Sequence, residues 1–245
     1  MRKTLLSIAL LSAIPALTLA ADCTFPGYVA TYQMTAKGTH VGSLVQRLSV
    51  NKSGQYHLTS KAYAHFLFFH DTIVETSSGH ITRGEILPTR YTMTSSRGHH
   101  PVKIHFEWSK GKAIFAVGKT QKTYPLHAGL YDNLSYQLAL RHDLLTESKH
   151  AYKVHFLALG KNHQPELRTQ TFTVKQGATL TFPRLGKVKT VEVQATDPST
   201  QDKALFWFAP KYGDLLVKSA TVEPGGKVLA AAELVRYQVK QGCAF

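Results

Sequence analysis

The sequence predicts a mostly β protein: a curved antiparallel sheet, forming a half-open or closed β-barrel, wrapped around one central α-helix. Three observations support this fold class. Apolar and polar residues alternate along most of the chain, glycine-containing pairs separate the alternating runs, and one segment near the middle has no alternation. A period of two is typical of strands that have one face on a core and the other face in water.

Seven strands are predicted in the first half of the chain. In the first of them, Tyr28, Ala30, Tyr32 and Met34 share one face. Turn pairs such as Ser78-Gly79 separate successive strands. The predicted ranges are 28–35, 39–50, 55–66, 71–77, 87–96, 102–108 and 112–117.

The segment from Asp132 to Leu145 predicts the helix, because it has strong helix formers and opens with a capping-type aspartate. Leu134, Leu138 and Leu145 form one apolar stripe. Three further apolar residues, Tyr136, Leu140 and Leu144, widen the stripe on the adjoining side. Because so broad a stripe implies burial over much of the circumference, we expect the helix to lie in the concave face of the sheet.

Six more strands follow the helix, and the pair Gln176-Gly177 predicts a turn among them. Many short strands at this spacing favour a meander that curls into a barrel. Neither an interdomain linker nor an internal repeat is visible, so residues 21–245 are predicted to form a single β-rich domain. The predicted ranges are 151–159, 168–175, 188–195, 204–208, 214–222 and 228–239.

Residues 1–20 are predicted to be a signal peptide, with cleavage after Ala20. Arg2 and Lys3 precede an apolar run that ends in small residues, which is the order found in secretory signals. A lipoprotein signal needs a small residue directly before the lipidated cysteine, and Asp22 occupies that position before Cys23. We therefore expect an exported, periplasmic protein that is not lipidated. After signal removal no stretch approaches the roughly 20 apolar residues of a membrane span.

Two cysteines, Cys23 and Cys243, lie near opposite ends of the predicted mature chain. In an oxidising compartment they are expected to form a disulfide that ties the first strand to the last. The alternative is two unpaired thiols.

The chain is strongly basic, with 29 Lys and Arg against 15 Asp and Glu. Removal of the signal takes away two basic residues and leaves an excess of 12. Such an excess favours anionic partners, namely a lipid or lipopolysaccharide-like ligand, an acidic glycan or an envelope protein. The alternative is a solvated basic surface that keeps the protein soluble. Export argues against nucleic acid.

Short motifs in a fixed order resemble the exported bacterial proteins grouped as domain of unknown function 3108, over essentially the whole mature chain. That family has no agreed activity or catalytic residues, so the resemblance implies no functional role for any residue. The motifs are Tyr32 with Gly42, Asp71, Leu87-Pro88-Thr89-Arg90-Tyr91, Asp132-x-Leu134-Ser135, the run from Gly186 to Val193, Phe206-Trp207-Phe208-Ala209-Pro210 and Leu216-Val217-Lys218.

A second resemblance concerns architecture. The Trp207-x-x-Pro210 strand and the strand that follows it are similar to the terminal hairpin of periplasmic lipoprotein carriers, whose half-barrels hold acyl chains beneath a helical lid. This resemblance implies a hydrophobic ligand, although a shared fold does not establish a shared function.

Aromatic residues are the candidate ligand-binding side chains. Phe66, Phe68 and Phe69 lie in one short run, and consecutive apolar residues cannot all face one side of a strand. We interpret the run either as a strand end wedged between sheet and helix or as a lip to an apolar cavity. Core packing is the alternative for the other candidate cavity walls, which are Trp108, Trp207 and Phe208.

No metal site or cofactor is predicted, because the 13 histidines lack metal-ligand spacing. His99 and His100 are adjacent, and His65 and His70 are five residues apart. No catalytic residue is predicted either, since the sequence has no nucleophile elbow and no phosphate-binding glycine loop. A carboxylate pair such as Asp71 with Glu75 or Glu107, or an acid–base element of His70 and Asp71, stays open.

The first functional hypothesis is a non-enzymatic envelope protein that holds a hydrophobic or lipid-like anionic ligand, with basic residues near the opening. The second is an adaptor for envelope assembly that recognises a protein or an acidic glycan through its basic surface. The third is a hydrolase of an envelope polymer.

Overall fold

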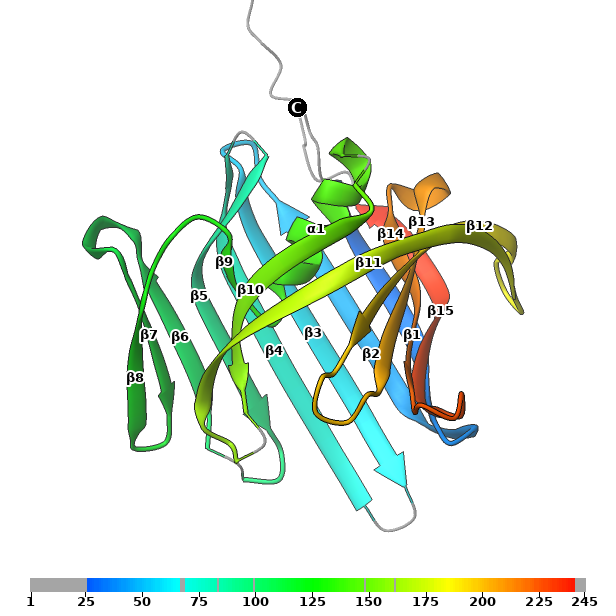
Figure 1. Cartoon of the computed structure of the whole chain (residues 1–245), viewed down its shortest axis with the longest axis horizontal. Coiled ribbons are helices and arrows are strands. Elements are labelled where there is room, and N and C mark those ends of the chain that lie inside the picture. The colour runs from blue at the N-terminus through cyan, green and yellow to red at the C-terminus, as the bar shows by residue number, and fades with distance from the viewer. Residues whose placement is uncertain are drawn as a thin grey trace, which may run out of the picture.

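The computed structural model describes residues 26–240 except 67, 68, 83, 99, 148 and 161, and of residues 66, 69, 176 and 240 it describes the backbone alone. The described residues form one 15-stranded sheet and one α-helix (Figure 1). The predicted fold class, a mostly β protein with a curved sheet around one helix, is confirmed, and the sheet is open rather than closed. The strands are β1 (Gly27–Ala36), β2 (Thr39–Val50), β3 (Gln55–Phe66), β4 (Phe69–Thr82), β5 (Glu85–Ser95), β6 (Val102–Glu107), β7 (Lys112–Val117), β8 (Thr120–Pro125), β9 (Leu130–Asp132), β10 (Ala151–Leu159), β11 (Pro165–Phe182), β12 (Gly186–Thr196), β13 (Lys203–Ala209), β14 (Leu215–Val222) and β15 (Val228–Lys240).

Two meanders make up the sheet, and they join through the first and last strands. The order across the sheet is β8-β7-β6-β5-β4-β3-β2-β1-β15-β14-β13-β12-β11-β10-β9. Every ladder is antiparallel except the pairing of β9 with β10. Because β1 pairs with β15, the two ends of the described chain lie side by side. Cys23 and Cys243 lie outside the described residues, as does the predicted signal peptide, so the disulfide stays a prediction.

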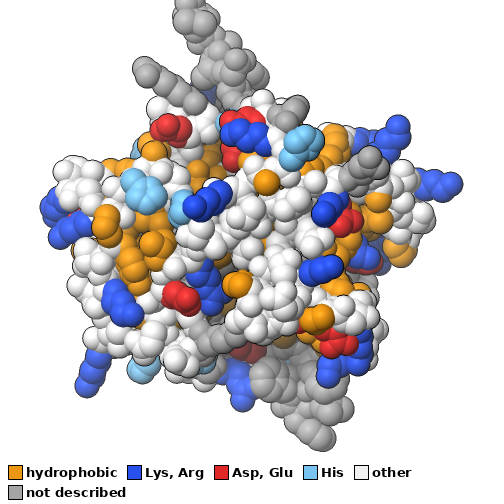
Figure 2. Space-filling model, viewed as in Figure 1, with side chains coloured by type: hydrophobic (Ala, Val, Ile, Leu, Met, Phe, Trp, Pro, Cys, Tyr) orange, Lys and Arg blue, Asp and Glu red, His pale blue; other side chains and the backbone are white. Residues whose placement is uncertain are grey.

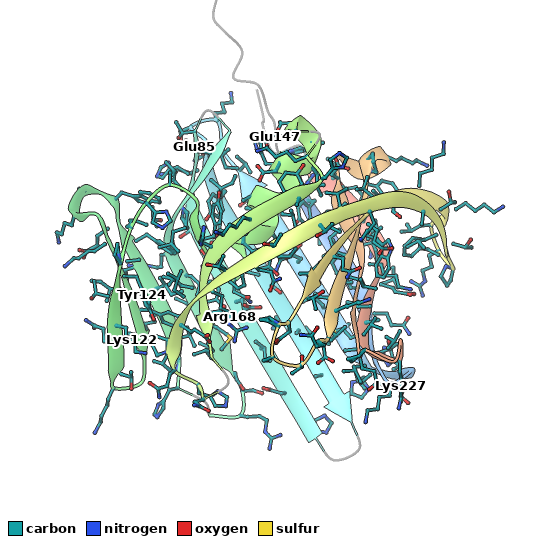
Figure 3. The ribbon with its side chains drawn as sticks, in the orientation of Figure 1. Glu85, Lys122, Tyr124, Glu147, Arg168 and Lys227 are labelled. Atoms are coloured by element: carbon teal, nitrogen blue, oxygen red, sulfur yellow. The ribbon has the colours of Figure 1, made fainter. Side chains whose placement is uncertain are left out.

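The two free edges of the sheet, β8 and β9, are not joined by a backbone ladder. Side chains connect β8 to the start of β11 instead (Figure 3). Lys122 Nζ and Tyr124 Oη both donate to the carbonyl oxygen of Pro165, at 3.2 and 2.8 Å. We call this contact between β8 and the β10–β11 hairpin the seam.

The helix α1 (Ser135–Thr146) lies inside the curved sheet, near one end of it (Figure 1). Leu138 packs in the larger core cluster, which draws on both meanders, whereas Leu140 packs with Phe172 and Phe208 in the second meander. Twelve residues of helix are about 18 Å long. The 14 residues of β4 span about 46 Å, so the helix can fill only part of the interior. No helix in the described part of the chain is long and apolar enough to cross a membrane.

A buried carboxylate fixes the start of the helix to the sheet. Asp132 is fully buried, and its Oδ1 accepts the backbone N–H groups of Leu134 and Ser135, each at 2.9 Å. Its Oδ2 accepts the hydroxyl of Ser77 on β4 at 2.7 Å, and Ser77 in turn contacts Tyr56 Oη at 3.0 Å. Burial raises the pKa of Asp132 to about 6 against the lowering effect of these hydrogen bonds.

The predicted helix boundaries need correction. The helix begins at Ser135 rather than at Asp132, because Asp132 is the last residue of β9 and binds the turn that precedes the helix. Leu145 belongs to the predicted apolar stripe, yet it is 41% exposed. Tyr136 carries more of the packing, since its ring stacks on Phe156 at 4.7 Å between centroids.

Two of the predicted turns are irregularities inside long strands. Gly79 lies within β4, and a Cβ there would come within 2.2 Å of the Leu87 carbonyl oxygen on β5. Gly177 lies within β11, where a Cβ would come within 2.6 Å of the Thr190 carbonyl oxygen. The register shifts at both places, as in a β-bulge. The short strands β8 and β9 were not predicted.

Replacement of Asp132 by Asn is expected to change how stability depends on pH. A folded-state pKa of about 6 lies above the usual carboxyl value, so this group contributes stability below about pH 4 and loses it as the pH rises through 6. The difference in unfolding free energy between wild type and Asp132→Asn should therefore vary by up to about 3 kcal/mol between pH 4 and pH 7. Urea titrations across this range measure the difference.

Asn can still accept the two backbone N–H groups, so it serves as the conservative variant. Asp132→Ala removes both acceptors and is expected to be about 2 to 4 kcal/mol less stable than Asp132→Asn at any pH, because neither variant titrates at this position. A constant difference between wild type and Asp132→Asn from pH 4 to pH 7 would contradict the assignment.

Candidate functional site

A cavity of about 700 Å³ occupies the part of the interior that α1 does not fill. Its walls are apolar side chains from four strands: Ile73 of β4, Met93 of β5, Val117 of β7 and Leu159 of β10. These residues lie near the ends of their strands, and polar residues from the adjacent turns surround them. The polar lining residues are Asp71, Ser95, His100, Lys119, Thr120, His163 and Gln164.

A second cavity of about 190 Å³ adjoins the first, because Met93 and Leu159 line both. Its lining adds a cation, Arg168, and two hydrogen-bonding side chains, Tyr91 and Asn133. The remaining lining residues are Val102, Phe115 and Ala158. The two cavities together form one space. Its walls in the large cavity are apolar, and the polar groups Tyr91, Asn133 and Arg168 line the smaller cavity. In Figure 2 hydrophobic side chains are visible at the left of this face, with Lys or Arg and acidic side chains close to them.

The acidic groups near these cavities already have partners. Asp71 accepts the hydroxyls of Ser95 at 2.9 Å and of Ser96 at 3.0 Å. Against a desolvation effect that acts to raise it, these hydrogen bonds lower the pKa of Asp71. The rim also carries the ammonium of Lys119 and the imidazole of His100.

Further inside, Glu75 joins β4, β5 and the segment before the helix. Its Oε1 accepts Tyr91 Oη at 2.6 Å and Asn133 Nδ2 at 2.7 Å. Burial, together with the charge of Glu75, raises the pKa of Tyr91, which therefore stays a hydrogen-bond donor at neutral pH. This contact holds the wall of the smaller cavity in place.

Comparison with known proteins identifies the family. The model of the family described as "Protein of unknown function (DUF3108)" matches residues 31–232. The chain belongs to the DUF3108 family. The resemblance predicted from the ordered motifs is thereby confirmed. A comparison with curated proteins finds no match.

A comparison with solved structures finds matches to this DUF3108 chain that include the following two. One is a beta-barrel-like protein of domain of unknown function DUF1849 from Brucella abortus, with 9% identity and a TM-score of 0.58, covering 88% of this chain and 98% of that chain. The other, a Bacteroides fragilis protein with YmcC-like fold, has 10% identity and a TM-score of 0.31, covering 87% of this chain and 96% of that chain. At this identity the first likeness shows the fold alone.

Among the predicted aromatic residues whose side chains are described, Trp108 lies in one meander of the DUF3108 fold, and Trp207 and Phe208 lie in the other. Trp108 directly follows β6 and donates to the carbonyl oxygen of Pro88 on β5, at 2.7 Å. Trp207 lies on β13 and donates to Glu192 at 3.0 Å. Phe208 follows it and lines a small cavity of about 20 Å³ beside the helix. The large cavity is lined by other described residues, so a ligand contact for these three stays a prediction.

The phenylalanine run lies where β3 turns into β4. The backbones of Phe66 and Phe69 pair with each other there, two residues before Asp71 of the cavity rim. Phe68 and the side chains of Phe66 and Phe69 lie outside the described residues, so their role as a lip to the cavity stays a prediction. The aliphatic residues that do line the cavity were missed, because alternating Ile, Met, Val and Leu are equally typical of a filled core.

Histidines and carboxylates form local contacts rather than a metal centre. Among the described residues no group of three His, Cys, Asp or Glu side chains is placed to hold a metal ion. Asp71 and Glu75 share a face of β4, about 13 Å apart along the strand. That separation exceeds the roughly 5 to 9.5 Å between the two carboxyl groups of glycosidases. Glu107 is bound by Lys110 at 3.2 Å.

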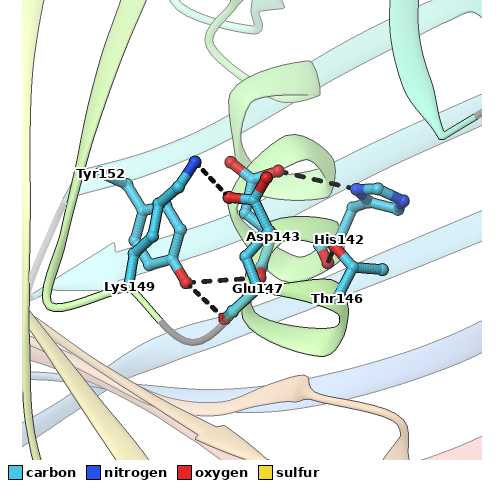
Figure 4. Close-up of polar contacts among 6 residues, drawn as sticks. All are labelled: His142, Asp143, Thr146, Glu147, Lys149 and Tyr152. Carbon is cyan, nitrogen blue, oxygen red and sulfur yellow. Dashed lines mark hydrogen bonds and ion pairs between the residues drawn. The ribbon is translucent and has the colours of Figure 1, made fainter.

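A polar cluster closes the far end of the helix (Figure 4). Tyr152 Oη donates to the carbonyl oxygens of Asp143 and Glu147, at 3.3 and 2.9 Å. The imidazole of His142 lies 3.6 Å from the Asp143 carboxylate. Burial, and then the charge of Glu147, raises the pKa of Asp143. These contacts terminate α1 at its last carbonyl groups and bring no nucleophile to the cluster.

Removal of the Tyr91 hydroxyl is expected to weaken the fold. Tyr91→Phe takes one donor from the partly buried carboxylate of Glu75, and a hydrogen bond to a charged group contributes about 1.5 to 3 kcal/mol. The midpoint of urea unfolding measures the loss. Tyr63→Phe is the matched control because Tyr63 is 41% exposed, and equal stability of the two variants would contradict the role given to Glu75.

Proposed function

We propose that this protein binds an elongated apolar molecule that carries an anionic group, and that it does so as a non-enzymatic protein of the bacterial cell envelope. The observation that carries the proposal is the cavity of about 700 Å³ with its wall of Ile73, Met93, Val117 and Leu159. Sites for small molecules are commonly 300 to 1,000 Å³, mostly apolar, and have a few polar groups that orient the ligand.

Packing supports a role for the cavity. Protein interiors are packed as densely as organic crystals and leave few voids larger than a water molecule. Apolar side chains that face a large void forgo both burial and contact energy, so an empty space of this size costs stability. A bound apolar chain restores those contacts, which is the physical reason to expect a ligand here.

The charge of the protein supports an anionic group on the ligand. The chain has a formal net charge of +14, and the cavity rim includes Lys119 while the smaller cavity includes Arg168. The carboxylates that face this region are bound to hydroxyl and amide donors. The charges of Lys119 and Arg168 balance those of Asp71 and Glu75 along this space, so the excess positive charge of the whole chain is what favours an anionic ligand.

The predicted signal peptide supports export, and the envelope supplies lipids with acyl chains and anionic head groups. A periplasmic site would place the protein among such ligands. Binding is favoured over hydrolysis because the nearby carboxylates Asp71 and Glu75 are each engaged by two donors and lie far apart.

Filling the cavity is expected to displace the ligand. Met93 lines both cavities, and Met93→Trp places an indole ring in that space. Protein exported by bacterial cells and extracted with organic solvent should release a lipid-like molecule from wild type. The amount per protein, measured by mass spectrometry, should fall at least fivefold for Met93→Trp.

Thr94→Trp is the matched control, since Thr94 follows Met93 on β5 and is exposed on the opposite face. It should carry as much ligand as wild type. Wild-type protein without an extractable ligand, or equal amounts from Met93→Trp and Thr94→Trp, would contradict the proposed function.

A further inference from the structure

Two cations, Lys122 of the seam and Arg168 of β11, bind the same residue pair of the β10–β11 hairpin. Leu159 and Pro165 are paired across the hairpin. Arg168 Nη2 donates to the Leu159 carbonyl oxygen at 2.8 Å, and Lys122 Nζ donates to the Pro165 carbonyl oxygen at 3.2 Å. Paired residues of antiparallel strands have Cα atoms about 4.5 to 5.5 Å apart. The guanidinium and the ammonium each bind one carbonyl group of the same residue pair.

The same place adjoins the apolar space. Leu159 lines both cavities, and Arg168 lines the smaller one. Figure 3 shows Arg168 on β11, with Lys122 and Tyr124 on the neighbouring edge strand β8. A chain that lies in the large cavity between Met93 and Leu159 therefore has a cation at each end, Lys119 at the rim and Arg168 in the smaller cavity.

We propose that Arg168, assisted by Lys122, binds the anionic head group of a single-chain lipid whose chain lies in the cavity. The inference rests on the proposed function and adds the position and the charge of the head group. Both a carboxylate and a phosphate monoester have the required chemistry, which is a compact anion with oxygen acceptors at the end of an apolar chain.

Both cations keep donors for such an anion. A guanidinium has five N–H donors in a planar fork, and an ammonium has three. Arg168 directs Nη2 to Leu159 and Nε towards Glu166, while Lys122 directs Nζ to Pro165. The fork of an arginine matches two oxygens of a carboxylate or phosphate, which gives short and strong hydrogen bonds.

One carboxylate opposes the anion. Glu166 Oε2 lies 3.5 Å from Arg168 Nε, and the Arg168 side chain is 41% exposed, so the pair is open to solvent and only partly neutralised. Glu75 is held by Tyr91 and Asn133 on the other side of the smaller cavity. Two cations and one nearby carboxylate leave the seam with a net positive charge, and removal of Glu166 should increase it.

The test uses the full mature protein and three probes with the same 16-carbon chain: hexadecanoate, hexadecyl phosphate and hexadecanol. Dissociation constants are measured by titration calorimetry at probe concentrations below aggregation. Arg168→Gln is expected to weaken both anions at least tenfold and to leave hexadecanol within twofold. Glu166→Gln is expected to tighten both anions by two- to fivefold. Arg90→Gln, an exposed arginine on β5, is the matched control and should change nothing.

The outcomes separate the inference from the proposed function. Failure of all three probes to bind would overturn both. Binding of hexadecanol as tightly as the anions, or anion binding that Arg168→Gln leaves unchanged, would overturn the head-group site and leave the chain-binding function standing. If Lys119→Gln rather than Arg168→Gln weakened the anions, the head group would bind at the rim and the inference would be wrong. A urea midpoint of Arg168→Gln close to that of wild type shows that the variant is folded.

Discussion

The fold depends on one constraint, which is that a short helix lies inside a sheet of much longer strands. Twelve helical residues cannot fill a space bounded by strands such as the 14-residue β4. The buried carboxylate of Asp132 binds the start of the helix to β4 through Ser77, so the helix is held at one end of the interior. The other end is left to side chains alone, and they leave a cavity of about 700 Å³.

The walls of this cavity are held by polar contacts rather than by packing across it. Glu75 connects Tyr91 of β5 to Asn133 before the helix, and Tyr124 connects β8 to the β10–β11 hairpin. The apolar side chains of Met93 and Leu159 remain exposed to the cavity. The seam joins the edge strand β8 of the open sheet to this hairpin by a few side-chain hydrogen bonds instead of a backbone ladder.

Much of the fold could be predicted from the sequence, and the site could not. Alternation on strands such as β1 and β6 is a local property, because it follows from which face of each strand meets the core. The short strands β8 and β9 depend on partners far along the chain, and the glycines of β4 and β11 have the composition of turns although they mark bulges. The aromatic residues were predicted to bind ligand because consecutive apolar residues such as the phenylalanine run cannot all face one side of a strand. Whether Ile73 or Val117 faces a void or a filled core depends on how far the helix extends, which no local pattern encodes.

Nuclear magnetic resonance of the bound chain tests the account most directly. Hexadecanoate, with its chain protons observed, is added to protein in which the methyl groups of Met, Val and Leu carry carbon-13. The account predicts intermolecular Overhauser effects from the chain to the methyl groups of Met93, Val117 and Leu159. Effects confined to the exposed Leu167, or to Leu138 of the helix core, would contradict a chain-binding cavity at the end of the sheet that the helix leaves unfilled.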